Sequence, residues 1–174
     1  MLRLITLALT LAALTVGALE PASAKTLRWA GRGDMQTTDP HSQNENLTNN
    51  INILIYEPLL IRDKTLKLLP ALATSWERLN PTTWRFKLRA GVKFHDGTPF
   101  TAEDVVFSFE RARANSSQLR VYANASGIPK KVDDLTVDFT TDGPNPIELE
   151  HINTIAEGRR KQLERWLSDS EAAV

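Results

Sequence analysis

The sequence predicts an α+β fold, and three observations lead to this prediction. Apolar residues alternate with basic ones in "WRFKLR", which is typical of a half-buried strand. The same period of two returns in "VDDLTVDF", on either side of a turn. Between these segments, "TAEDVVFSFERAR" begins with a helix cap and continues at helical spacing. Strand pairs that flank a capped helix indicate antiparallel or mixed strands packed with helices.

Composition excludes several classes of function. The 174 residues include 21 Lys and Arg against 21 Asp and Glu, so the formal net charge is zero. Such a chain lacks the positive excess that attracts nucleic acid or anionic lipid, and we expect no nucleic-acid partner. The absence of cysteine excludes a disulfide scaffold, a thiol nucleophile, a zinc–cysteine site and a lipid-modified cysteine.

The N-terminus has the pattern of a secretory signal peptide. Arg3 precedes an apolar run that extends from Leu4 to Leu19, and Ala22-Ser23-Ala24 supplies small residues for a signal peptidase. The run is shorter than the roughly 20 residues that a membrane-spanning helix needs. We therefore expect residues 1–24 to be removed before Lys25, leaving an exported chain in the periplasm with no stable membrane insertion.

A short strand around Leu27 and an irregular loop are expected to open the mature chain. In the loop, Gly31-Arg32-Gly33 lacks the third glycine of a dinucleotide motif, and Arg32-Gly33-Asp34 is too short to indicate adhesion. We interpret the segment as a flexible loop. Loops that follow strands often carry ligand contacts.

A helix is predicted next, near Leu47–Tyr56. Its apolar residues fall at helical spacing and increase toward Tyr56, so we expect a polar start and a buried end, with Pro58 as the stop. The following apolar run, Leu59 to Ile61, predicts a short buried strand.

The segment from Ala73 to Phe94 predicts an antiparallel hairpin with one wet face. Its strands are centred on Trp76 and Phe86, and Asn80-Pro81 marks the turn between them.

The helix Ala102–Arg113 follows a turn at Asp96-Gly97. Thr101 is the expected N-cap with Asp104 as its capping-box partner, and Phe100 is expected to pack on Val105. Val105, Val106, Phe109 and Ala112 form the predicted buried face, whereas Glu103, Glu110 and Arg113 are expected to lie mostly toward water.

His95 beside Asp96 raises the alternative of a catalytic or metal site. His41 and His151 are distant in sequence without a partner at helical spacing, and no G-x-S-x-G nucleophile motif is present. We interpret His95 as a structural residue and expect neither a metal site nor catalytic residues.

A second hairpin is predicted from Val132 to Phe139. Asp133-Asp134 is the expected turn, and Val137 alternates with polar residues after it. Gly143, Pro144 and Pro146 then interrupt the regular pattern.

These segments carry a resemblance to a known family. "YEPLL", "LLPALATSWE", "WRFKLRAGVKFHDGTPFTAEDVVFSFERAR", "VDDLTVDF" and "PNPI" occur in the order and spacing of the family 5 extracellular solute-binding proteins. The chain resembles this family, which serves dipeptide and oligopeptide ABC importers, from about Leu27 to about Ile155.

The resemblance implies part of a two-lobed periplasmic-binding-protein fold of class II type. It implies a receptor whose partners are a small peptide or other small solute and a membrane permease, without catalysis or a cofactor. It also places one wall of the ligand cleft directly after the first strand. On this basis the expected ligand-binding residues are Gly31, Arg32, Gly33 and Asp34.

The resemblance ends before the chain does. We expect a signal peptide at 1–24, part of the first lobe with its inserted subdomain at 25–155 and a divergent tail at 156–174, with the second lobe missing. Truncation with a changed reading frame near Ala156 and a natural short variant are the alternatives. Two functions remain open: a solute-binding component of an ABC importer, and an exported fragment that binds no solute and at most contacts other proteins. An exported hydrolase is a distant third.

Overall fold

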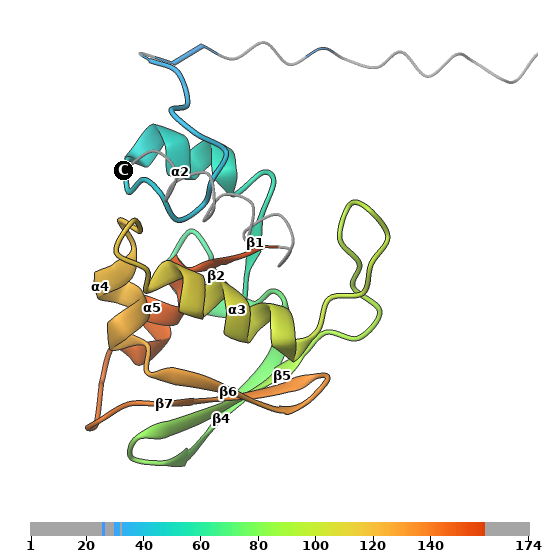
Figure 1. The fold of residues 1–174 in the computed structure, drawn as a ribbon, viewed down its shortest axis with the longest axis vertical. Coiled ribbons are helices and arrows are strands. Elements are labelled where there is room, and N and C mark those ends of the chain that lie inside the picture. The colour runs from blue at the N-terminus through green and yellow to red at the C-terminus, as the bar shows by residue number, and fades with distance from the viewer. Residues whose placement is uncertain (1–25, 27–29, 32, 159–174) are drawn as a thin grey trace, which may run out of the picture. The chain divides into compact units, whose positions relative to one another are not determined.

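The computed structural model describes residues 26, 30–31 and 33–158. The chain divides into two units, Met1–Arg32 and Gly33–Val174, and the described helices and strands belong to the second (Figure 1). The predicted signal peptide, the predicted strand around Leu27 and most of the predicted tail lie outside the described residues. In the part that is described, no helix is long and apolar enough to cross a bilayer.

A four-stranded antiparallel sheet is the largest element of the fold. Its order is β4-β5-β7-β6, with β4 at Ala73–Asn80, β5 at Thr83–Leu88, β6 at Ile128–Asp133 and β7 at Thr136–Thr140. Both predicted hairpins are therefore confirmed, and β5 pairs with β7 to join them. The second turn is displaced by one residue from its predicted place, because Asp133 still pairs with Thr136 as part of β6.

Helix α3, Ala102–Ala112, packs on β6 and β7, and Figure 1 shows it crossing one face of the sheet. The predicted capping box is present: the Glu103 amide donates to Thr101 Oγ1 at 3.3 Å, and the Thr101 amide donates to Asp104 Oδ2 at 2.9 Å. Val105 and Phe109 are fully buried, as the helical spacing predicts.

Three phenylalanines hold α3 to the sheet. The ring centroid of Phe139 lies 4.7 Å from that of Phe109 and 5.4 Å from that of Phe86, both in edge-to-face geometry. All three side chains are fully buried. Such pairs add about 0.5–1.5 kcal/mol to the burial of their apolar area, so this contact fixes the helix over the sheet.

Two short helices were not predicted. They are α4, Arg120–Ala125, and α5, Glu148–Thr154, and neither N-cap residue makes a side-chain hydrogen bond. The helix-terminal Arg113 was wrongly expected to face water: its guanidinium donates to the carbonyls of Ala123 and Gly127. This contact ties the end of α3 to the end of α4.

The remaining elements are short. Helix α2, Asn46–Asn52, precedes β1, Glu57–Pro58, which pairs with β8, Ala156–Glu157; β2, Leu60–Arg62, pairs with β3, Leu68–Pro70. Leu60 is buried as predicted, whereas Ile61 is exposed. Helix α2 begins close to its predicted start but ends at Asn52, and the predicted buried end is wrong.

Candidate functional site

A groove with a volume of about 1220 Å³ lies among the described residues. Its walls come from the end of α2 and the turn after it (residues 50–58), from the loop after β5 (residues 92–96) and from the end of β8. Small-molecule pockets usually measure roughly 300–1,000 Å³. The groove is thus large enough for an elongated organic solute.

One wall of the groove is apolar and faces solvent. Ile53, Leu54 and Ile55 are 63%, 81% and 41% exposed. Consecutive exposed residues of this size are unusual in a monomeric surface and mark a place where another molecule or another part of a protein binds.

Local hydrogen bonds explain why these residues face outward. Past the last residue of α2 the chain forms a tight turn, in which the amides of Ile55 and Tyr56 both donate to the Asn52 carbonyl at 2.9 Å. Asn52 itself is buried, and the Tyr56 hydroxyl donates to the Thr38 carbonyl at 3.0 Å. The turn is anchored at both ends, so the three apolar side chains between the anchors remain exposed.

The opposite wall is the turn that the sequence predicts at Asp96-Gly97. Gly97 has φ +84°, its amide donates to the Phe94 carbonyl at 2.9 Å, and Asp96 Oδ1 accepts from the Thr98 amide at 3.1 Å. The Phe94 ring meets Phe100 edge to face at 5.8 Å. The turn therefore presents Phe94 to the groove on a fixed support.

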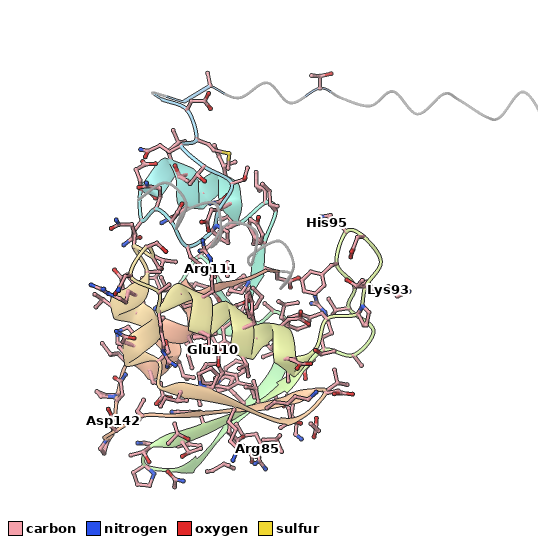
Figure 2. All side chains as sticks on the ribbon, viewed as in Figure 1. Arg85, Lys93, His95, Glu110, Arg111 and Asp142 are labelled. Atoms are coloured by element: carbon pink, nitrogen blue, oxygen red, sulfur yellow. The ribbon has the colours of Figure 1, made fainter. Side chains whose placement is uncertain are left out.

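His95 is exposed on this turn and lines the groove together with Lys93. Figure 2 shows both residues on the loop that projects from the body of the domain, with His95 beside its tip and Lys93 on its outer side. No group of three or more potential metal-binding side chains lies together within the described residues. A structural role for His95 stays a prediction.

An acidic side chain closes one end of the groove. Glu157, at the end of β8, is only 3% exposed, and neither of its carboxyl oxygens accepts a hydrogen bond from the residues that the structure describes. Burial raises the pKa of Glu157 well above its ordinary value; the Ser108 hydroxyl acts in the opposite direction, and the charge of Asp104 adds to the rise. The groove therefore combines apolar walls with a buried carboxyl group.

A buried polar cluster behind the groove holds β8 in place. Arg111 of α3 forms an ion pair with Asp39, whose carboxylate also accepts from the His41 amide at 3.0 Å. The His41 ring nitrogen Nε2 lies 3.0 Å from the Ala156 carbonyl. Burial, followed by the charge of Arg111, lowers the pKa of His41 to about 4, so this ring is neutral at physiological pH.

No local sequence signal reveals the two long-range contacts of the buried polar cluster behind the groove. Asp39 and Arg111 are 72 positions apart, and His41 and Ala156 are 115 apart.

The predicted ligand-binding residues do not line this groove. Gly31 belongs to the other unit and Arg32 lies outside the described residues. Gly33 is exposed near Leu47, and Asp34 Oδ1 accepts from the adjacent Met35 amide at 2.8 Å. A role of these residues in solute binding stays a prediction.

The fold is shared with periplasmic solute-binding proteins. A crystal structure of NikZ from Campylobacter jejuni in complex with Ni(L-His) superposes with a TM-score of 0.62 at 25% identity, covering 71% of this chain and 25% of that one. OppA from Haemophilus influenzae in complex with RPPGFSPFR gives a TM-score of 0.65 at 25% identity, covering 75% of this chain and 30% of that one. The predicted fold class, an incomplete α+β part of a periplasmic-binding-protein fold, is confirmed.

The chain belongs to the bacterial extracellular solute-binding proteins, family 5 (Middle), whose model matches residues 67–170. The periplasmic oligopeptide-binding protein OppA of Escherichia coli K12 is 31% identical over 145 residues, which cover 72% of this chain and 26% of that protein. The chain thus spans about a quarter of the length of this relative. The family match continues past Ile155, where the sequence led us to place the start of a divergent tail.

Proposed function

We propose that this chain is part of a periplasmic solute-binding receptor of an ABC importer and that its solute is a peptide. Family membership supports a binding role, since the curated relatives are binding proteins. The peptide assignment draws on the names of OppA and of the structure in complex with RPPGFSPFR. We further propose that residues 1–24 are removed on export and that a membrane permease receives the solute.

The groove is the observation that carries this proposal. Peptides combine apolar side chains with charged ends and backbone amides, and the groove offers exposed aliphatic residues on one wall, an aromatic ring on the other and a carboxyl group at one end. Solute sites are concave, mostly apolar and supplied with a few polar groups that fix orientation. The volume exceeds that of an ordinary small-molecule pocket, as a peptide requires.

Binding by this chain alone is expected to be weak. Pockets normally bury 70–90% of a small ligand, whereas this groove is open. If a complete receptor binds at about 1 μM, or about −8.2 kcal/mol, and this surface provides roughly half of that free energy, the dissociation constant becomes about 1 mM.

Chemical-shift mapping by NMR tests the proposal at that affinity. We expect mixed di- to pentapeptides at millimolar concentration to shift the amide signals of residues 53–58, 92–96 and 157–158, and to leave the β4–β5 turn at Asn80 unchanged. Peptides that shift no signal, or that shift the Asn80 turn as strongly as the groove, would contradict it.

A matched pair of variants locates the binding surface. Leu54 and Leu79 are both exposed, but only Leu54 lines the groove. Leu54→Ser removes apolar contact area and is expected to weaken the peptide titration severalfold, whereas Leu79→Ser is expected to leave it unchanged. Equal titrations for the two variants would show that peptides bind elsewhere.

A further inference from the structure

We propose that the buried carboxyl group at the end of the groove binds an organic ammonium or guanidinium group of the solute, with Glu157 as its counter-ion. This inference rests on the proposed function and names a feature of the solute that the site selects. The ammonium has two sources in a peptide, the free amino end and a basic side chain.

The first argument is the state of Glu157 itself. Its side chain is almost fully buried at the groove surface, yet within the described part of the chain it has no hydrogen-bond donor. Buried carboxylates are ordinarily paired or hydrogen-bonded, because burial of an unpaired charge is costly. A cationic solute would supply the missing donors.

The second argument concerns the groups around Glu157. Ser108 is engaged with the backbone of Gly158, because its Oγ donates to the Gly158 carbonyl at 3.4 Å and accepts from the Gly158 amide at 3.1 Å. Asp104, in the first turn of α3, is a second carboxyl group whose charge acts on Glu157. Burial is the main cause that raises the pKa of both carboxyls, and the charge of Asp104 adds to the rise at Glu157; a cation beside Glu157 would offset this repulsion.

The third argument is that the basic residues of the groove do not compete for the site. Arg62 forms an ion pair with Glu150, and Lys93 extends outward from its loop (Figure 2). A solute ammonium that enters between the Ile53–Ile55 turn and Phe94 would reach Glu157 with apolar surface on both sides, and the burial of the Glu157 side chain would strengthen its attraction to the carboxylate.

Three peptides distinguish the sources of the cation. Dileucine carries a free amino end, N-acetyl-dileucine has none, and N-acetyl-Leu-Lys offers only a basic side chain. With NMR titration of the purified chain, we expect acetylation of dileucine to weaken binding at least about tenfold, because it leaves the carboxylate unpaired. Binding of N-acetyl-Leu-Lys as tight as that of dileucine would assign the site to a basic side chain.

Glu157→Gln and Glu110→Gln form a matched pair for this test. Both replace a carboxyl group by an amide of the same shape, but Glu110 is exposed on α3 and does not line the groove. In Glu157→Gln, dileucine and N-acetyl-dileucine are expected to bind equally, whereas Glu110→Gln is expected to keep the tenfold preference. The amide should fold at least as well as the unpaired acid.

The outcomes separate this inference from the proposed function. If all three peptides bind the groove of the unaltered chain with equal affinity, or if Glu157→Gln retains the preference for the free amino group, the inference is wrong and peptide binding stands. If no peptide shifts a groove signal, the proposed function fails with it.

Discussion

Replacement of Gly127 by alanine adds a single methyl group, yet it is expected to lower the free energy of unfolding strongly. It has φ +81° and immediately precedes β6, whose first residue, Ile128, pairs with Thr140. A Cβ atom at this position would lie 2.6 Å from the Thr140 carbonyl oxygen and 2.7 Å from its carbon. Both obstacles are backbone atoms of the neighbouring strand, so the strands themselves would have to separate.

Gly91 provides the matched control for this prediction. It also has a positive φ, +75°, but an added Cβ would meet nothing within 4 Å. Gly91→Ala should therefore cost only the left-handed backbone term of about 1–2 kcal/mol. Gly127→Ala pays the same term plus about 1–3 kcal/mol for the overlap, which gives a total of about 2–5 kcal/mol. Effects of alanine on the unfolded chain are common to both variants and cancel in the difference.

Urea unfolding of the two variants at one pH measures that difference. Trp76 and Trp84, which are partly buried in the β4–β5 hairpin, report unfolding by fluorescence. We expect a lower midpoint for Gly127→Ala than for Gly91→Ala at equal slope. Free energies of unfolding that agree within about 0.5 kcal/mol would refute the steric argument.

Three further predictions concern the helix cap, pH and the N-terminal loop. Thr101→Ala should lower the free energy of unfolding by about 1 kcal/mol and accelerate amide exchange at the start of α3, whereas Thr101→Ser, which keeps the hydroxyl, should do neither. Equal amide exchange in the two variants would contradict the N-cap role of the Thr101 hydroxyl. The pKa of His41 is lowered to about 4, so the folded state loses stability from this ring as pH falls from 6.5 to about 4. The pKa of Glu148 is raised by burial to about 7, so the folded state loses stability from this carboxyl group as pH rises from 4.5 to about 7. Urea titrations across this range should show a smaller loss of stability with rising pH in Glu148→Gln, with the remainder coming from Glu157, whose pKa burial also raises; a loss as large as in the unaltered chain would reject the assignment. Asp34→Lys should weaken peptide binding in the NMR titration more than Asn80→Lys does, and equal effects would remove the reason to place the ligand at Asp34.

The sequence predicted the elements that local interactions determine. The turn at Asp96-Gly97 and the cap at Thr101 depend on side chains within four positions of each other, and all of their expected hydrogen bonds occur. The hairpins were equally visible, because alternation around Phe86 and Val137 reflects burial on one face of the sheet. The fold class followed from these elements.

The groove depends on contacts that no local pattern encodes. Strand β8 pairs with β1 across about a hundred positions, and this pairing is what buries Glu157. Ile53 to Ile55 were predicted to be buried because apolar residues at helical spacing usually are. The end of α2 at Asn52 instead leaves them exposed, and the sequence contains no proline or glycine at that point to announce it. Helix α5 was missed for a similar reason, since its N-cap lacks a side-chain hydrogen bond.

The sequence predicted neither the exposure of Ile53 to Ile55 nor the burial of Glu157, and all of these residues line the same groove. Together they indicate which kind of molecule the groove binds. Exposed aliphatic residues and a buried unpaired carboxyl group each reduce stability, and departures of this kind concentrate at functional sites. An apolar protein segment lying on the Ile53–Ile55 turn would cover the aliphatic residues but leave Glu157 unpaired and more deeply buried, at a further cost. A solute that carries an ammonium group beside an apolar side chain would cover the aliphatic residues and also pair with the Glu157 carboxyl group. The shape of the groove alone is compatible with either occupant, and the carboxyl group at its end favours the charged solute.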